Sequence, residues 1–310
     1  MKKEEFYFES RDGVSRIHGV RYLPDTGDVI GVLQIIHGIS EYVERYDAFA
    51  NYLTERGFVV VAEDHMGHGK SVNGDGIPGY FTGGWFRAVE DSYRLLQDTR
   101  KEYPELPYVL LGHSMGSFMT RTILYQHPDS GISAAIICGT GWQPAAAMPA
   151  AVKFMELACK KVGETNPSEK LHDLIFGKYN ARVDHPKTAA DWVCRDSRIV
   201  ENHPMLSGAL PTSGLLRDMI IGVSSVERME NLAQMNKELP VYFVAGGEDP
   251  VGSYGKGVKK CADAFRKAGM QDVTLRIYPL CRHEILNEIN CQEVFENLVQ
   301  WVDSRLKKAE

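Results

Sequence analysis

The sequence has no long apolar run. None of its hydrophobic stretches approaches the roughly 20 residues that a helix needs to cross a bilayer, which excludes an integral membrane segment. The first residues, Met1-Lys2-Lys3-Glu4-Glu5, lack the apolar character of a secretory leader. We therefore expect no leader and a cytoplasmic location.

The sequence also has few cysteines and no excess of positive charge. Its six cysteines show no paired spacing, so we expect reduced thiols rather than a disulfide framework. The formal net charge is -6 and no basic stripe offsets it, which argues against nucleic acid as a partner. The cysteines are Cys138, Cys159, Cys194, Cys261, Cys281 and Cys291.

What remains is the composition of a globular enzyme. Of the 310 residues, 44% are hydrophobic and 25% are charged, which is ordinary for a folded domain. This length is sufficient for one full α/β core together with an insertion.

The most informative segment is Gly112-His113-Ser114-Met115-Gly116. It follows the apolar run 108–111, which predicts a strand, and precedes a predicted helix over 117–126. A serine between glycines at a strand-to-helix turn is typical of a nucleophile elbow. The serine backbone is strained there, and the glycines leave room for the neighbouring strand and helix. An ordinary glycine-rich loop is the alternative, and the flanking strand and helix argue against it.

A nucleophilic serine needs a base, and the base needs a carboxylate that orients it. Asp249 follows a predicted strand over 240–245, and His283 follows another over 274–278. The carboxyl ends of such strands meet at one edge of a sheet. The sequence therefore predicts a catalytic triad of Ser114, Asp249 and His283.

Each partner has another interpretation. Asp249 precedes Pro250, and this pair is common in turns, while Glu248 is a rival carboxylate. His283 is one of ten histidines, and a hydrogen-bonded loop histidine is the alternative interpretation. The chain order of serine, aspartate and histidine, each after a predicted strand, favours the triad.

Three further motifs extend the pattern beyond the triad: the segment 35–42 with Arg45-Tyr46, the loop 64–71 and the segment 192–196. With these motifs the chain resembles α/β-hydrolases of the monoacylglycerol lipase and lysophospholipase type, also called serine aminopeptidase-like hydrolases. The resemblance covers nearly the whole chain. It departs at Ser40, where the mammalian lipases have glycine, and at Cys281-Arg282 before the histidine.

Acyl transfer also needs two backbone N–H groups that face the developing oxyanion. The elbow places one of them at Met115. The resemblance implies that the other is Ile39, after His37-Gly38. We expect His37 to hold this loop by hydrogen bonds rather than to move protons, since the base is already assigned.

Neither a metal nor another cofactor is predicted. His65-x-x-His68 stands in an apparent loop and no third ligand is evident. Gly67-x-Gly69 lacks the third glycine and the helix of a dinucleotide-binding motif.

The pattern predicts one α/β-hydrolase domain, interrupted once. A mostly parallel central sheet flanked by helices is expected over 1–140 and 238–310, and a helical cap is expected over 141–237. The expected core strands are 6–10, 16–22, 32–36, 58–62, 108–111, 134–138, 240–245 and 274–278, and the core helices are 46–53, 85–103, 117–126 and 293–307.

The cap has no clear strand pattern. Helices are expected over 147–162, 168–176, 188–194 and 214–235. Methionine is frequent there, either to line an acyl-chain pocket or as ordinary core packing. The pocket candidates are Met148, Met155, Met205 and Met219.

The sequence therefore predicts hydrolysis, through an acyl-enzyme, of carboxylic esters with an apolar acyl chain. The resemblance implies a monoacylglycerol or lysophospholipid, with transient contact to lipid aggregates and a monomer or homodimer. Three alternatives stay open: an aminopeptidase or amidase on the same triad, a non-hydrolytic reaction on this fold, and a catalytically silent binding protein. Acidic cap residues that grip an amine, such as Asp191, Asp196 or Glu201, would favour the first.

Overall fold

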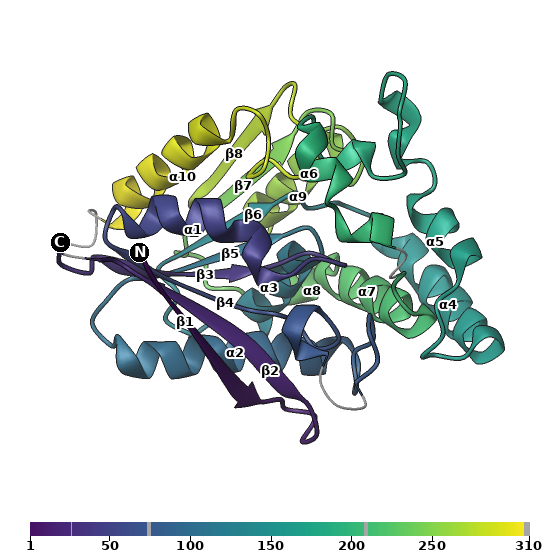
Figure 1. Ribbon diagram of the computed structural model, residues 1–310, viewed down its shortest axis with the longest axis horizontal. Coiled ribbons are helices and arrows are strands. Elements are labelled where there is room, and N and C mark those ends of the chain that lie inside the picture. The colour runs from purple at the N-terminus through teal and green to yellow at the C-terminus, as the bar shows by residue number, and fades with distance from the viewer. Residues whose placement is uncertain (26, 73–75, 208–209, 307–310) are drawn as a thin grey trace.

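A single eight-stranded sheet organises the chain (Figure 1). The computed structural model describes residues 1–25, 27–72, 76–207 and 210–306. The strand order is β1-β2-β4-β3-β5-β6-β7-β8, antiparallel from β1 to β4 and parallel from β4 to β8, which confirms the predicted mostly parallel sheet. The strands are β1 Lys2–Glu9, β2 Arg16–Leu23, β3 Gly31–Ile36, β4 Phe58–Glu63, β5 Tyr108–His113, β6 Ala134–Cys138, β7 Val241–Gly246 and β8 Val273–Tyr278.

The five strands β3 to β7 are buried along their whole length, as expected of a sheet covered on both faces. Successive side chains point to opposite faces, so each strand contributes to two separate cores. In β3, for example, Val32 and Ile36 belong to one core, whereas Leu33 and Ile35 belong to the other.

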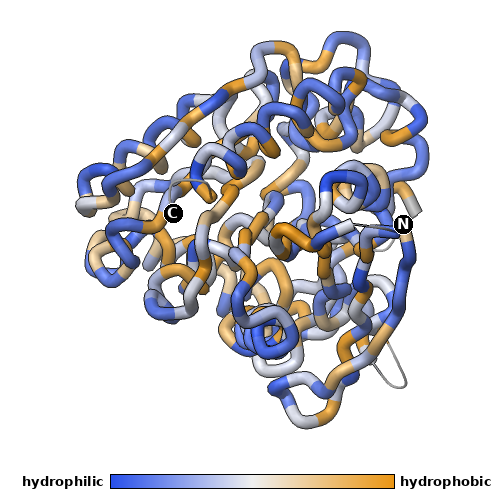
Figure 2. The backbone as a smooth tube through the Cα atoms, turned by 90° about the vertical axis from the view of Figure 1, so that its left-hand side faces the viewer, coloured by the Kyte–Doolittle hydropathy of each residue, from blue (hydrophilic) through white to orange (hydrophobic). Residues whose placement is uncertain are grey.

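Helices cover both faces. Helices α1 (Asp47–Thr54) and α10 (Cys291–Leu306) pack on one face, where the ring centroids of Phe49 and Phe295 lie 4.8 Å apart. Helices α2 (Trp85–Glu102), α3 (Met115–Gln126) and α9 (Lys256–Lys267) contribute to the other core. In Figure 2 the hydrophobic segments gather in the interior and hydrophilic ones lie outside.

Two core helices differ from the expectation. Helix α9 was not predicted, although Val258, Cys261, Ala262 and Phe265 recur at helical spacing and are buried. Helix α10 begins at Cys291, two residues earlier than expected, and Lys307 at its predicted end lies outside the described residues.

The segment between β6 and β7 is helical; we call residues 141–237 the insertion. It occupies the right side of Figure 1, and its described residues contain one isolated bridge, Pro167 with Thr212, and no longer strand. Its helices are α4 Met148–Val162, α5 Glu169–Phe176, α6 Ser197–Glu201, α7 Ser213–Val226 and α8 Met229–Leu232.

Two helix predictions in the insertion are wrong. Residues 188–194 form only the 3-10 turn Asp191–Val193. The Arg282 side chain donates to the carbonyl oxygens of Asp191 and Cys194, at 2.6 and 2.9 Å, and a longer helix would need such groups for its own bonds. Residues 214–235 form two helices because α7 ends at Val226.

The end of α7 is set by a buried arginine. Arg121 of α3 donates to the carbonyl oxygen of Val226 at 3.0 Å and lies 3.3 Å from Glu227 Oε1. Its guanidinium also donates to the carbonyl oxygen of Gly141 at 3.2 Å. One side chain of the elbow helix therefore binds the insertion where the chain enters it and again at the end of α7.

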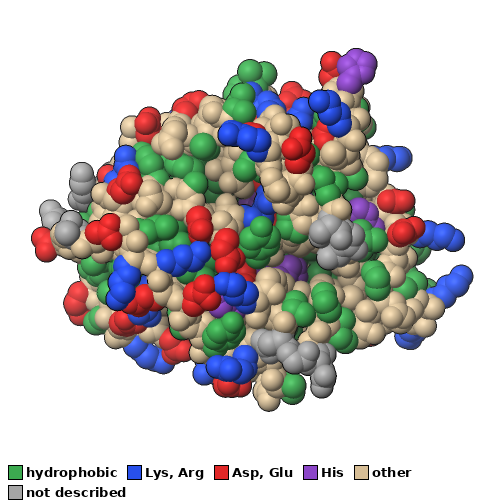
Figure 3. Space-filling view, viewed as in Figure 1, with side chains coloured by type: hydrophobic (Ala, Val, Ile, Leu, Met, Phe, Trp, Pro, Cys, Tyr) green, Lys and Arg blue, Asp and Glu red, His purple; other side chains and the backbone are tan. Residues whose placement is uncertain are grey.

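Lys, Arg, Asp and Glu side chains are interspersed over the face shown in Figure 3, without a large area of one sign. Across the described ranges, no helix is both long enough and apolar enough to span a bilayer.

Candidate active site

Ser114 lies in a sharp turn between β5 and α3. Its backbone has φ 53° and ψ -119°, a left-handed conformation that costs energy for a residue with a side chain. A Cβ atom at Gly112 would overlap the carbonyl of Gly116, and one at Gly116 would overlap the carbonyl of Ile36. The two glycines therefore allow the strand and the helix to approach closely enough for this turn.

Asp249 and His283 meet at the same edge of the sheet. The His283 Nδ1 atom lies 3.0 Å from Asp249 Oδ2, and both side chains are buried. The other carboxylate oxygen of Asp249 accepts the Val251 N–H at 2.9 Å, which fixes its orientation. Glu248, the rival carboxylate, is exposed. Ser114 and His283 line one cavity.

Two backbone amides are available beside the serine. Ile39 and Met115 both line this cavity, and neither amide donates a hydrogen bond to another described residue. Met115 is the first residue of α3, where N–H groups have no partner within the helix and favour negative charge. Both residues thus have the backbone groups that an oxyanion hole requires.

The loop that carries Ile39 is held from several sides. The Gly38 N–H donates to Glu41 Oε2 at 2.8 Å, and the Tyr46 hydroxyl donates to the same oxygen at 2.6 Å. His37 Nδ1 bonds the Gly38 carbonyl at 2.7 Å, and its Nε2 accepts the His65 N–H at 3.0 Å. His37 is thus placed to hold the loop.

Ser40, the departure noted in this loop, has φ 58°. Glycine adopts this left-handed conformation more easily than serine does.

His65 and His68 lie beneath the loop and contact backbone groups. His65 Nε2 is 3.0 Å from the His37 carbonyl oxygen, and His68 Nδ1 is 3.0 Å from the Met66 carbonyl oxygen. Burial lowers the pKa of His68 to about 4. His68 therefore acts as a neutral donor, while His65 binds the backbone of the loop that carries Ile39.

The cavity has a volume of about 340 Å³ and two chemically different ends. Its apolar end joins the insertion to the elbow helix through Phe118, Met148, Ala151, Ile175, Phe176, Met219, Ile220 and Val223, and Met205 also lines it. Met155, the fourth methionine proposed for the pocket, does not line the cavity. It lies seven residues, or about 10 Å, beyond Met148 along α4 and packs in the core instead.

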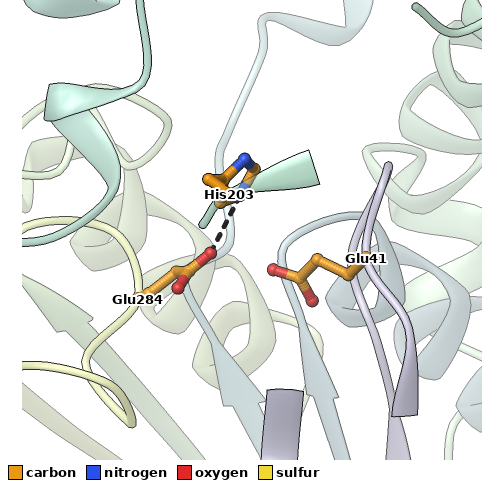
Figure 4. A group of neighbouring side chains, drawn as sticks. All are labelled: Glu41, His203 and Glu284. Atoms are coloured by element: carbon orange, nitrogen blue, oxygen red, sulfur yellow. Dashed lines mark ion pairs between the residues drawn. The ribbon is translucent and has the colours of Figure 1, made fainter. Parts of the chain in front are cut away.

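The polar end was not predicted from the sequence. Glu41, His203 and Glu284 line it, one from the loop that carries Ile39, one from the insertion and one next to His283 (Figure 4). His203 Nε2 lies 3.1 Å from Glu284 Oε1, and Arg45 Nη2 donates to Glu284 Oε2 at 2.6 Å. Glu284 stands beside the predicted base and gave a usable signal, whereas nothing in the sequence marked His203.

These three side chains place ligand atoms within 4.8 Å of one another, a spacing that suits a metal ion. The hydrogen bonds of these side chains do not suit a metal ion. His203 Nδ1 accepts the Met205 N–H at 3.2 Å, so the proton of neutral His203 is on Nε2, which leaves no lone pair facing Glu284. Arg45 already donates to one oxygen of Glu284, and the Gly38 amide donates to one oxygen of Glu41. The group therefore has the chemistry of a hydrogen-bonded network.

The insertion also fixes the loop that carries His283. Arg195 donates to Glu288 at 2.8 Å, and the Glu284 N–H donates to the Val193 carbonyl oxygen at 2.7 Å. The Trp192 ring lies 5.0 Å from that of His283. Arg282, part of the departure noted before the histidine, belongs to the same contact through its bonds to the 191–194 segment.

Comparison with known proteins gives the family of the chain. The family model described as "Serine aminopeptidase, S33" matches residues 27–290. The monoacylglycerol lipase of Mycolicibacterium smegmatis is 29% identical, and the match covers 98% of each chain. Human monoglyceride lipase is 27% identical over 93% of this chain and 88% of its own.

Solved structures give the same result. A thermostable carboxyl esterase from Bacillus coagulans, in complex with glycerol, superimposes with a TM-score of 0.89 at 29% identity and covers 99% of both chains. A monoglyceride lipase variant from Saccharomyces cerevisiae superimposes with a TM-score of 0.76 at 18% identity over 98% of this chain and 96% of its own, which supports the fold alone.

Proposed function

Since the chain belongs to the serine aminopeptidase S33 family and has relatives among esterases and lipases, we propose that it hydrolyses monoacylglycerol-like esters through an acyl-enzyme. The observation that carries the proposal is the cavity itself. Ser114 lines it together with apolar side chains, which suit an acyl chain, and with carboxylates, which suit a hydroxylated alcohol.

In the proposed reaction, His283 removes the proton of Ser114 while Asp249 holds the imidazole, and the serine attacks the ester carbonyl. The amides of Ile39 and Met115 stabilise the negative oxygen, each contributing about 3 kcal/mol in the transition state. His283 then protonates the leaving alcohol, and water repeats the sequence on the acyl-enzyme.

The polar end favours a neutral alcohol over a phosphorylated one. Glu41 and Glu284 face the cavity, whereas Arg45 is not among the residues that line it. The hydroxyl groups of glycerol can donate to carboxylate oxygens, but a phosphodiester offers only acceptors. We therefore propose a monoacylglycerol rather than a lysophospholipid.

We further propose that residues 141–237 act as a cap over a core of 1–140 and 238–310. The insertion supplies the acyl side of the cavity through Met148, Phe176 and Met219 and the polar side through His203. Contact with lipid aggregates is part of this proposal, because the substrate is poorly soluble in water.

The experiment that tests the mechanism is Ser114→Ala. We expect turnover of p-nitrophenyl butyrate to fall by a factor of about 10⁴ or more, because triad members act as a unit. A fluorophosphonate probe should label the wild type at Ser114 and leave the variant unlabelled. Unchanged turnover by a folded variant would contradict the assignment, and an unlabelled wild type would instead indicate a catalytically silent binding protein.

The substrate is tested by a panel of monoacylglycerols from butyryl to oleoyl beside oleoyl lysophosphatidylcholine. We expect the monoglyceride to exceed the lysophospholipid of the same chain in kcat/KM by at least about tenfold. Equal values would reject the role given to the two carboxylates.

One observation favours a second candidate, an aminopeptidase or amidase. Buried carboxylates in the cavity also suit an ammonium group, and Glu41 and Glu284 provide them. The acidic residues first considered for this role, Asp191, Asp196 and Glu201, do not line the cavity. Comparing p-nitrophenyl esters with aminoacyl p-nitroanilides separates the two reactions.

A further inference from the structure

His113, the residue before the nucleophile, has an oxygen atom beside each ring nitrogen. Its Nδ1 lies 3.2 Å from Glu41 Oε1, and its Nε2 lies 3.4 Å from the carbonyl oxygen of His283. The side chain is 3% exposed, so water does not replace either contact. His113 thus lies between the oxyanion loop and the loop of the catalytic histidine.

Neither oxygen can supply a proton. A carbonyl oxygen only accepts, and Glu41 is an ionised carboxylate that already accepts from the Gly38 amide and the Tyr46 hydroxyl. Although burial opposes its charge, His113, Arg45 and Tyr46 hold the pKa of Glu41 well below its usual value. A neutral imidazole has one N–H, so one nitrogen lone pair would face an oxygen lone pair in a buried site.

The charges around His113 also favour an imidazolium, in which both ring nitrogens carry a proton. Arg45 compensates the buried carboxylate of Glu284, whereas the cation nearest to Glu41 Oε1 is His113. A buried charge without a partner is strongly unfavourable. Of the other titratable groups around His113, Tyr46 and Cys138 supply no charge because burial raises the pKa of both, and the Glu284 carboxylate adds negative charge. Burial lowers the pKa of His113 itself, but the nearby Glu41 outweighs this and raises it.

We propose that His113 is a constant imidazolium that positions the oxyanion loop against the His283 loop, through an ion pair with Glu41 and a hydrogen bond to the His283 carbonyl oxygen. It is a positioning residue, because it touches Glu41 and the His283 backbone rather than the substrate. It also acts by charge, since its ring centroid lies 4.7 Å from that of His283.

The protonation state is tested directly by NMR of the full-length enzyme labelled with ¹⁵N-histidine. The His113 signals are those that disappear in His113→Gln. We expect both ring nitrogens to carry protons from pH 6 to pH 8.5. In Glu41→Gln, which removes the counter-charge, we expect one proton at pH 8.5. A single protonated nitrogen in the wild type at pH 7 overturns the proposal.

The kinetic test rests on the proposed ester hydrolysis, whereas the NMR result does not, so the two can fail separately. In His113→Gln we expect kcat for p-nitrophenyl butyrate to fall about tenfold, with KM changed less than about threefold. The acid limb of the kcat/KM profile should move to higher pH by about 0.5 unit, because the cation beside the base is lost. The double variant Glu41→Gln/His113→Gln should shift the acid limb less, because it removes the anion together with the cation.

The matched control is His127→Gln, which removes a histidine paired with Glu90 at 2.7 Å on the protein surface. It should leave both kcat and the pH profile unchanged. If His113→Gln behaves like this control while remaining folded, His113 has no positioning role, whatever its protonation state.

Discussion

At the residue scale, Asp218 is the clearest case of a buried charge without full compensation. Its side chain is 2% exposed; Arg217 Nε binds Oδ1 at 2.9 Å, and Oδ2 has no partner among the described residues. Burial raises the pKa of Asp218 to about 6. Because the folded state holds this proton more tightly than the unfolded state, the contribution of Asp218 to stability falls as pH rises from about 4 to 6.

Asp218→Asn should therefore stabilise the protein at high pH. We expect the free energy of unfolding to rise by about 1–2 kcal/mol at pH 8 and to be nearly unchanged at pH 4, since only the wild type titrates. Urea unfolding at both pH values measures this difference. Asp263→Asn, which removes an exposed aspartate paired with Arg266, is the control. A gain that is equal at both pH values would contradict the explanation.

The two methionines of α4 allow a matched test of the acyl pocket. Met148 lines the cavity and Met155 does not. Met148→Trp should lower kcat/KM for dodecanoyl esters at least about tenfold relative to butyryl esters, because the larger ring fills the space of several methylene groups. Met155→Leu should leave that ratio within about twofold. The same loss in both variants would indicate a general effect on stability.

At the element scale, contact between α7 and α2 fixes the insertion on the core. A Cβ atom at Gly222 would overlap the indole ring of Trp85, whose Nε1 donates to Thr122 Oγ1 at 3.2 Å. Gly222→Val should therefore lower the free energy of unfolding by about 2 kcal/mol, because the two helices must separate. Thermal unfolding measures this loss of stability, and Ala150→Val, at an exposed position, is the control. An unchanged midpoint would show that α7 can shift without cost.

The sequence predicted the strands better than the insertion, for physical reasons. Strands such as β3 and β5 are buried on both faces, so they read as continuous apolar runs, and their order fixes the edge where Ser114, Asp249 and His283 lie. The insertion is ended and bent by distant side chains. Arg121 binds the last carbonyl group of α7 and Arg282 binds carbonyl groups of the 191–194 segment, and no local pattern contains either contact.

The same limit applies to the site. The elbow is a local motif, so it was predicted with its glycines. The polar end of the cavity is not local, because His203 approaches Glu284 from a segment 81 residues earlier in the chain. Helix α9 is different: its apolar spacing was present in the sequence and was overlooked.

At the scale of the whole molecule, the insertion presents apolar side chains to solvent. On α4, Phe154 is 51% exposed and Leu157 is 57% exposed. The double variant Phe154→Ser/Leu157→Ser should weaken association with phosphatidylcholine vesicles at least about threefold, since less apolar surface enters the lipid. Vesicle co-sedimentation measures binding, and turnover of soluble p-nitrophenyl butyrate should be unchanged.

The control for this prediction removes exposed apolar residues elsewhere. Val14 and Ile30 are also exposed and belong to the sheet region rather than to the insertion. Val14→Ser/Ile30→Ser should not alter vesicle binding. Equal weakening by both double variants would mean that binding depends on total surface hydrophobicity rather than on α4.

The shared contact of Arg121 with Gly141 and Val226 has a consequence for how such a chain can be rebuilt. Because one guanidinium reaches both backbones, the carbonyl groups of Gly141 and Val226 lie close together, so the segment 142–225 starts and ends near one point. A short glycine–serine bridge could span them after excision, and the eight-stranded scaffold would keep its register. The architecture is therefore modular: a foreign lid with closely spaced ends could be grafted at this point to change which molecules reach the serine.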